Sequence, residues 1–166
     1  MKPKATVFVI FLLVLVTAAQ AGQYKVTRVY DGDTIKAQGH DIEIEVRLIG
    51  IDAPEMSKKK GVPSQPYGEI AKKHLTGLIH TKVVDIISYG FDQHNRLLGV
   101  VYFEGRNINL EMVKAGLAEV CRHKIREFDL MPYLQSEQVA RTTQRGMWSI
   151  SNIYISPRVW RKGKEE

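Results

Sequence analysis

The chain has 166 residues, enough for one domain with a sizeable hydrophobic core. Lysine and arginine outnumber aspartate and glutamate by 24 to 18, an excess that suits a polyanionic partner without identifying one. The only cysteine, Cys121, cannot form an internal disulfide, which excludes a disulfide-stabilised scaffold.

The first segment, residues 1–21, has the features of a secretory signal peptide. Lys2 and Lys4 give a positive start, residues 5–16 form an apolar run, and Ala19-Gln20-Ala21 offers small residues to a signal peptidase. An uncleaved membrane anchor is the alternative, but the run is too short to span a bilayer comfortably. We expect cleavage after Ala21, a secreted or periplasmic protein, and no membrane contact in the mature chain. Without Lys2 and Lys4, 22 basic residues face 18 acidic ones.

The first part of the mature chain carries mostly strand patterns. Every second residue from Tyr24 to Tyr30 lies on one side of an alternation, and Ile42–Leu48 alternates apolar residues with charged ones. Lys82–Ile87 and Leu97–Phe103 are β-branched or aliphatic runs bounded by turn residues.

Three segments have helical patterns. Residues 67, 70, 71, 74, 75, 78 and 79 form one apolar stripe, which predicts a helix between two of the strands. Asn107–Leu117 and Met131–Arg145 predict two later helices, the last of them ended by Gly146. This order predicts an α+β fold, a closed five-stranded β-barrel with three helices over residues 22–150. Residues 151–166 form a C-terminal extension, whose basic end we expect to be frayed.

Four short motifs stand out along this framework. Asp31-Gly32-Asp33-Thr34 reads by itself as a hairpin turn, because Asp-Gly is favoured there. The segment from Arg47 to Glu55 is more specific: an arginine leaves a strand, and Asp52 and Glu55 flank Ala53-Pro54, whose proline stiffens the loop.

The third motif runs from Asp92 to Leu98 and reads as a turn in which Arg96 enters the next strand. The fourth, Arg145-Gly146-Met147-Trp148, combines a helix stop with a core anchor, and we assign it no chemistry.

Together the first three motifs offer the parts of a phosphodiesterase site. Asp33, Asp52 and Glu55 are hard oxygen ligands, which favour Ca²⁺ or Mg²⁺ over zinc or copper. Arginine forks match phosphate oxygens and stay charged at any working pH, and a carboxylate can take the proton of an attacking water. An ordinary polar loop and two turns remain the alternative reading of the same residues.

The motifs resemble those of the staphylococcal nuclease (thermonuclease) family, in the same order, over roughly Tyr24 to Trp148. Besides the three motifs, Lys60-Gly61-Val62, Tyr67-Gly68 and Gly116-Leu117-Ala118 are similar to the family. The resemblance implies an OB-fold barrel with three helices and an enzyme that cleaves DNA and RNA to 3′-phosphate ends.

The resemblance also implies roles for single residues. Asp33 and Asp52 would be Ca²⁺ ligands with the main-chain carbonyl of Ala53, and Arg47, Glu55 and Arg96 would be catalytic. The type member of the family has Thr at the position of Ala53. A ligand supplied by the main-chain carbonyl survives this change of side chain. The nucleotide-packing tyrosines are replaced by His94 and Arg122, which are therefore the candidate substrate-binding residues.

Two kinds of function are compatible with this pattern. The favoured one is an exported, calcium-dependent nuclease, a monomer acting on DNA and RNA, preferably single-stranded. The other is a non-catalytic OB-fold module that binds nucleic acid or a protein. A degenerate module of that kind is expected to have lost one of Arg47, Asp52, Glu55 and Arg96, and all four are present.

Overall fold

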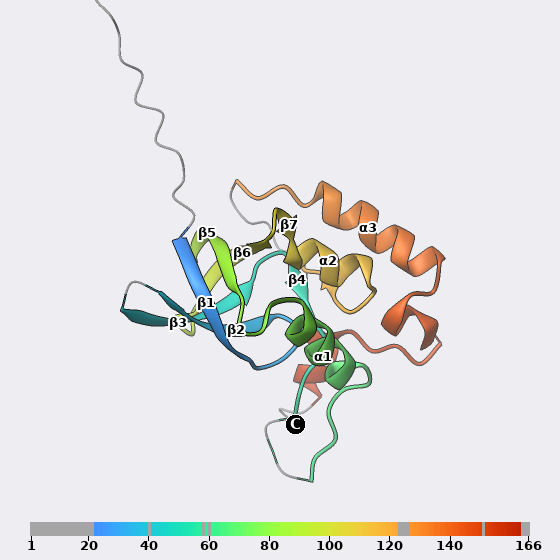
Figure 1. Ribbon diagram of the computed structural model, residues 1–166. Coiled ribbons are helices and arrows are strands. Elements are labelled where there is room, and N and C mark those ends of the chain that lie inside the picture. Colours follow the sequence, from blue (N-terminus) through green and yellow to red (C-terminus); the bar gives the residue numbers. More distant parts are fainter. Residues whose placement is uncertain are drawn as a thin grey trace, which may run out of the picture.

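The computed structural model describes residues 22–39, 41–57, 59, 61–122, 127–150 and 152–163. The predicted leader, residues 1–21, lies outside the described residues, as do the last three residues of the chain. Within the described ranges, the chain forms a barrel with helices packed beside it (Figure 1).

Five strands close into the barrel: β1 (Gly22–Val29), β2 (Thr34–Gly39), β3 (Ile42–Leu48), β5 (Val83–Phe91) and β6 (Leu97–Phe103). Strand β1 pairs antiparallel with β2 and β5, β2 pairs with β3, and β5 pairs with β6. A parallel pairing of β3 with β6 completes the circle, so the predicted five-stranded barrel is confirmed.

Three two-residue strands extend this arrangement. Strand β7 (Arg106–Asn107) continues the sheet beyond β6, and β4 (Ile51–Asp52) pairs antiparallel with β8 (Glu119–Val120). The β4–β8 pair matters for the site, because it fixes the strand on which Asp52 lies.

A bulge changes the predicted alternation of β1. Val26 pairs with Ala37 and Arg28 with Lys36, so one extra residue is inserted on β1. Val29 is consequently the buried residue, whereas Arg28 is exposed and Tyr30 only partly buried. The alternation predicted from Tyr24 to Tyr30 is therefore wrong beyond Val26.

The helices are α1 (Gly68–Ile79), α2 (Ile108–Lys114), α3 (Met131–Thr142) and α4 (Pro157–Lys162), with a 3-10 turn, η1 (Gly146–Ile150), after α3. The three predicted helices are present, and α4 adds a short fourth one among the described residues. Helix α1 buries a narrower face than predicted, because Ile70 and His74 are exposed.

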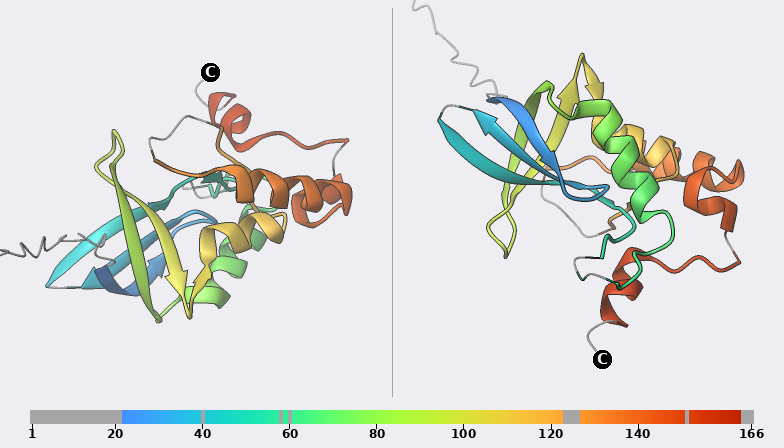
Figure 2. Two further views of the ribbon diagram at one scale, coloured as in Figure 1. Left: turned by 90° about the horizontal axis from the view of Figure 1, so that it is seen from above. Right: turned by 60° about the horizontal axis from the view of Figure 1, so that its bottom comes forward.

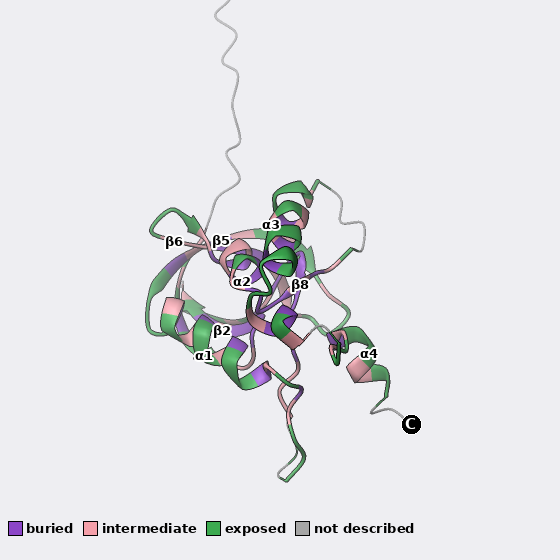
Figure 3. Ribbon diagram, turned by 90° about the vertical axis from the view of Figure 1, so that its right-hand side faces the viewer, coloured by how far each residue is buried: buried purple, intermediate pink, exposed green. Residues whose placement is uncertain are grey.

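The core lies between the barrel and helices α1, α2 and α3, as the buried residues in Figure 3 show. At its centre, the buried Asn109 of α2 accepts a hydrogen bond from the Val101 amide and donates to the carbonyls of Ile49 and Gly99, each at 3.0 Å. This side chain satisfies buried backbone groups that would otherwise be costly to desolvate.

A second, smaller cluster joins α3 to η1. Met147 and Trp148 are buried there, and Gly146 turns the chain with φ 54°. The Arg141 guanidinium lies 3.7 Å from the centroid of the Trp148 ring. Trp148 is therefore the core anchor that the sequence predicted.

The chain beyond η1 runs back along the molecule to the loop that follows β4, where it ends in α4 (Figures 1 and 2). In the part of the chain that the structure describes, no helix is long and apolar enough to cross a membrane.

Candidate active site

The turn between β1 and β2 is packed against two other elements. The Asp33 amide donates to the Asp31 carboxylate at 3.0 Å, which shapes the turn. A Cβ added at Gly32 would lie 2.6 Å from the Cβ of Ala53 and 2.7 Å from that of Ala71. Only glycine fits, and the close approach places Asp33 against the segment that follows β4.

Asp33 is almost completely buried and connects three parts of the chain. Its Oδ2 accepts a hydrogen bond from the Ala53 amide at 2.6 Å. Its Oδ1 accepts hydrogen bonds from the Thr34 hydroxyl at 3.0 Å and from Arg47 Nη1. The structure thus joins Asp33 to the main chain of Ala53 through the Ala53 amide, whereas the resemblance implies the Ala53 carbonyl as the ligand.

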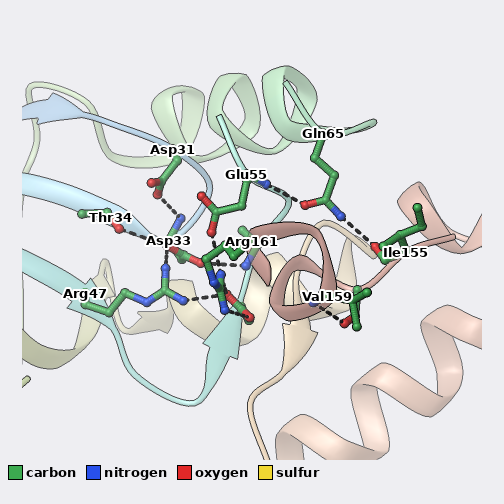
Figure 4. A network of polar contacts seen from close by, with 12 residues as sticks. Asp31, Asp33, Thr34, Arg47, Glu55, Gln65, Ile155, Val159 and Arg161 are labelled. Carbon is green, nitrogen blue, oxygen red and sulfur yellow. Dashed lines mark hydrogen bonds and ion pairs between the residues drawn. The ribbon is translucent and has the colours of Figure 1, made fainter. Parts of the chain in front are cut away.

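Arg47, on β3, bridges two carboxylates. Its Nη1 donates to Asp33, and its Nη2 donates to Asp52 Oδ1 at 2.7 Å (Figure 4). Asp52 is 5% exposed and lies in the β4–β8 pair. Two buried carboxylates this close would repel each other strongly, and the guanidinium offsets that repulsion.

Glu55 lies on a loop with fixed main-chain atoms. The main-chain amide of Glu55 donates to the side-chain oxygen Oε1 of Gln65 at 3.0 Å, and the main-chain amide of Gln65 donates to the Glu55 carbonyl at 2.9 Å. A Cβ added at Gly68 would lie 2.7 Å from the same carbonyl, so the loop packs directly on the start of α1. The Glu55 carboxylate itself is partly exposed and shares a guanidinium partner with Asp52.

The structure adds a residue that the motifs did not include, Arg161 of α4. Its Nη1 donates to Asp52 Oδ1 at 2.9 Å and to Glu55 Oε1 at 2.5 Å, and its Nη2 donates to Asp52 Oδ2 at 2.8 Å. Burial opposes ionisation of Asp52, but hydrogen bonds and charges of Arg161 and Arg47 outweigh it and hold the pKa of Asp52 below its ordinary value. No motif could identify Arg161, because it lies in a basic segment more than 100 residues from Asp52 in sequence.

Arg96 immediately precedes β6, the strand that pairs with β3, and is held by the turn before it. Asp92 accepts hydrogen bonds from the amides of His94 and Arg96 at 2.8 and 2.9 Å, and from Arg96 Nε at 2.8 Å. Despite some opposing desolvation, these contacts hold the pKa of Asp92 below its ordinary value.

The charge of Arg96 also reaches the first motif. Burial raises the pKa of Asp31, while the charges of Arg47 and Arg96 act in the opposite direction on that carboxyl. The Arg96 fork itself contacts Asp92.

The two candidate substrate-binding residues lie in different surroundings. His94 is exposed at the tip of the β5–β6 hairpin. The Arg122 side chain is 58% exposed, but its Nη2 donates to the buried carboxylate of Glu137 on α3. Arg122 therefore has a structural partner in addition to any role at the surface.

The carboxylates of Asp33, Asp52 and Glu55 fit a hard divalent cation in their chemistry, since all their donors are oxygens. They already hold cationic groups, because Asp52 shares one guanidinium with Asp33 and another with Glu55. In this arrangement no group of three or more His, Cys, Asp or Glu residues within the described ranges is placed to hold a metal ion. The residues present suit the ion that the resemblance implies, provided that both guanidinium groups move: Arg47 from between Asp33 and Asp52, and Arg161 from between Asp52 and Glu55.

Comparisons with known proteins identify a family for the chain. A family model described as "Staphylococcal nuclease homologue" matches residues 45–150. An "Uncharacterized endonuclease" of Haemophilus influenzae is 35% identical over 159 residues, which cover 95% of this chain and 83% of the relative.

Two further relatives are similar over most of their length. An "Uncharacterized endonuclease" of Escherichia coli O157:H7 is 37% identical over 141 residues, covering 84% of this chain and 85% of the relative. A "Micrococcal nuclease" of Shigella flexneri is 32% identical over 171 aligned positions, covering 98% of this chain and 93% of the relative.

Proposed function

Since the chain belongs to the family of staphylococcal nuclease homologues, we propose that it is an exported, calcium-dependent nuclease that cleaves DNA and RNA to 3′-phosphate ends. Its relatives include proteins named endonuclease and micrococcal nuclease, and both names describe cleavage of phosphodiester bonds. The observation that carries the proposal is a charged junction: Arg47 joins the buried Asp33 to Asp52, and Arg161 joins Asp52 to Glu55.

Each residue of this junction has a chemical task. Calcium, when bound by Asp33, Asp52 and the Ala53 carbonyl, supplies positive charge that polarises the phosphate. Glu55, on its fixed loop, accepts the proton of the attacking water. Arg47 and Arg96 donate to the phosphate oxygens, where negative charge grows in the transition state.

The buried carboxylates, together with the arginines beside them, also argue against a module that only binds nucleic acid. A surface that binds nucleic acid needs cations, but it has no use for buried carboxylates such as Asp33 and Asp52, which repel phosphates. We propose that the protein acts as a monomer on single strands, whose backbone can follow an open polar surface. Export rests on the signal peptide pattern of residues 1–21.

We predict that cleavage requires calcium and that Mg²⁺ replaces it poorly. Mg²⁺ demands near-ideal octahedral geometry, whereas Ca²⁺ accepts irregular sets of oxygen ligands, including main-chain carbonyls. The test measures release of acid-soluble nucleotides from single-stranded DNA by the mature chain in Ca²⁺, in Mg²⁺ and in excess chelator. Treatment of the products with a phosphatase specific for 3′ ends identifies 3′-phosphate ends. Full activity in chelator would contradict the metal assignment.

We predict that substrate binding depends on phosphates more than on bases. His94 and Arg122, at the positions of tyrosines in the family, offer ring stacking and a guanidinium fork, respectively. Affinity is expected to fall steeply with salt, as counterion release requires, and to vary little with base sequence. The measurement is binding of short single strands to the inactive Glu55→Gln variant at several salt concentrations.

The His94→Ala and Arg122→Ala variants test the two residues separately. Each is expected to weaken binding, and Arg122→Ala is also expected to lower stability by about 1–3 kcal/mol, because it takes a partner from the buried Glu137. If neither substitution changes the affinity or its salt dependence, these residues do not touch the substrate.

A further inference from the structure

The C-terminal arm, defined as residues 152–163, is anchored beside the candidate active site. The buried Gln65 donates from Nε2 to the Ile155 carbonyl at 2.7 Å, while its Oε1 accepts the Glu55 amide. The Tyr154 hydroxyl donates to Glu119 Oε2 at 2.5 Å, and the Tyr154 ring packs 4.7 Å from the Trp148 ring, centroid to centroid. The first contact fixes the arm to the loop that positions Glu55, and the other two fix it to β8 and η1.

Helix α4 continues from this anchor and has few means of its own to stay folded and in place. Pro157 opens it, and the Ser156 hydroxyl accepts the Val159 amide at 3.3 Å. Six residues are too few for a helix that is stable alone. Pro157 is the only fully buried residue of α4, and the partly buried Trp160 ring lines a hollow with Gln65, Tyr154 and Ile155. Arg161 therefore supplies the charged contacts that attach α4 to the domain, beside the packing of Trp160.

Arg161 occupies the positions that a cation needs. Its fork takes both oxygens of Asp52, and the same Nη1 reaches Glu55 (Figure 4). A calcium ion contacts carboxylate oxygens directly, at about 2.3–2.6 Å, and cannot share both oxygens of its ligand Asp52 with the Arg161 fork. Arg47, which lies between the ligands Asp33 and Asp52, must also give way in either case. A divalent cation and Arg161 are both positive and would repel each other there.

We propose that the C-terminal arm is an intramolecular competitor of the divalent cation. Without the cation, Arg161 neutralises Asp52 and Glu55 and holds α4 against the site. Cation binding to Asp52 displaces Arg161 and releases α4, while Tyr154 and Ile155 keep the arm attached. The inference rests on the proposed function, because it uses the calcium ligands assigned there.

Thermodynamic linkage relates the loss of cation affinity to the fraction of molecules in which the arm is closed. When only a fraction of the molecules has an open site, the apparent dissociation constant rises by the inverse of that fraction. An arm that is closed in about nine molecules of ten therefore weakens cation binding about tenfold. By reciprocity, saturating cation raises the fraction of molecules with an open arm by the same factor.

The first experiment measures calcium binding to the mature chain by titration calorimetry, without nucleic acid. We expect Arg161→Ala to bind calcium about tenfold more tightly than wild type. Arg158→Ala is the matched control, because it removes the same charge from an exposed position of the same helix, and it is expected to bind like wild type. Circular dichroism checks that each variant is folded.

The outcomes separate the two proposals. If all three proteins bind calcium with the same dissociation constant, the competition fails while the calcium site stands. If Arg161→Ala and Arg158→Ala tighten binding equally, the effect is one of net charge and the competition also fails. If none of the three binds calcium, the calcium assignment of the proposed function fails, and the competition fails with it.

The second experiment follows the release of α4 in the wild-type chain. Trypsin cleavage after Arg158 is measured by mass spectrometry, with and without calcium. Calcium is expected to speed this cleavage in wild type, whereas Arg161→Ala is expected to be cut rapidly in both conditions. A wild-type rate that calcium leaves unchanged would overturn the displacement of α4.

Discussion

Replacing Glu55 with glutamine is expected to reduce kcat for single-stranded DNA by at least about a hundredfold, because the amide cannot take the proton of the attacking water. The fold should survive, since the main chain of residue 55 is held by Gln65 and by the start of α1. The measurement is a cleavage rate at saturating calcium, so that any change in calcium affinity does not enter.

The matched control is Glu43→Gln, which removes a carboxylate from the exposed face of β3. Its rate is expected to equal that of wild type. If Glu55→Gln cleaved as fast as this control, Glu55 would not be the base, and its role would be limited to its contact with Arg161.

Replacing Arg96 with alanine is expected to cost a similar factor, at least about a hundredfold in kcat, through the loss of a donor to the transition state. Asp92→Asn should cause a smaller loss. Asp92 orients Arg96 through one main-chain hydrogen bond and through Oδ2, which contacts both Nε and Nη2, and an asparagine side chain can replace only part of this. Rates of both variants at saturating calcium and substrate provide the measurement.

Arg106→Ala serves as the control for Arg96, because Arg106 is an exposed arginine on β7. It should leave kcat unchanged. Wild-type activity in Arg96→Ala would mean that the Asp92–Arg96 segment is only a turn, as the simplest interpretation of its sequence suggests.

The barrel could be predicted because most of its strands carry their own patterns. In β3, Val46 and Leu48 are buried and Glu43 and Glu45 are exposed, as the alternation requires. Strand β2 has no such pattern, since Thr34, Ile35 and Ala37 are all buried. The bulge in β1 could not be predicted either, because an inserted residue follows from pairing with β2 rather than from local periodicity.

The candidate site was predictable where its residues are close in sequence. Asp52 and Glu55 flank a proline, and Arg47 precedes them on the same strand and loop. That Asp33 joins them depends on the contact of Gly32 with Ala53 and Ala71, which only the fold shows.

The contact of Arg161 with the site could not be predicted from the sequence, for a different reason. Its segment was expected to be frayed because it is short, basic and terminal. Helix α4 forms there because Asp52 and Glu55 supply the charge that Arg161 needs, and because Gln65 fixes the chain at Ile155. These are tertiary contacts, and no local pattern encodes them.

Calcium-dependent cleavage with Glu55 as the base is tested most directly by three reactions on one labelled single-stranded DNA: wild type in calcium, wild type in chelator, and Glu55→Gln in calcium. We expect rapid cleavage in the first reaction only, with the DNA still bound but intact in the third. Equal cleavage in the first two reactions would contradict the calcium site. Binding without cleavage in all three would show that the protein is a binding module and not a nuclease.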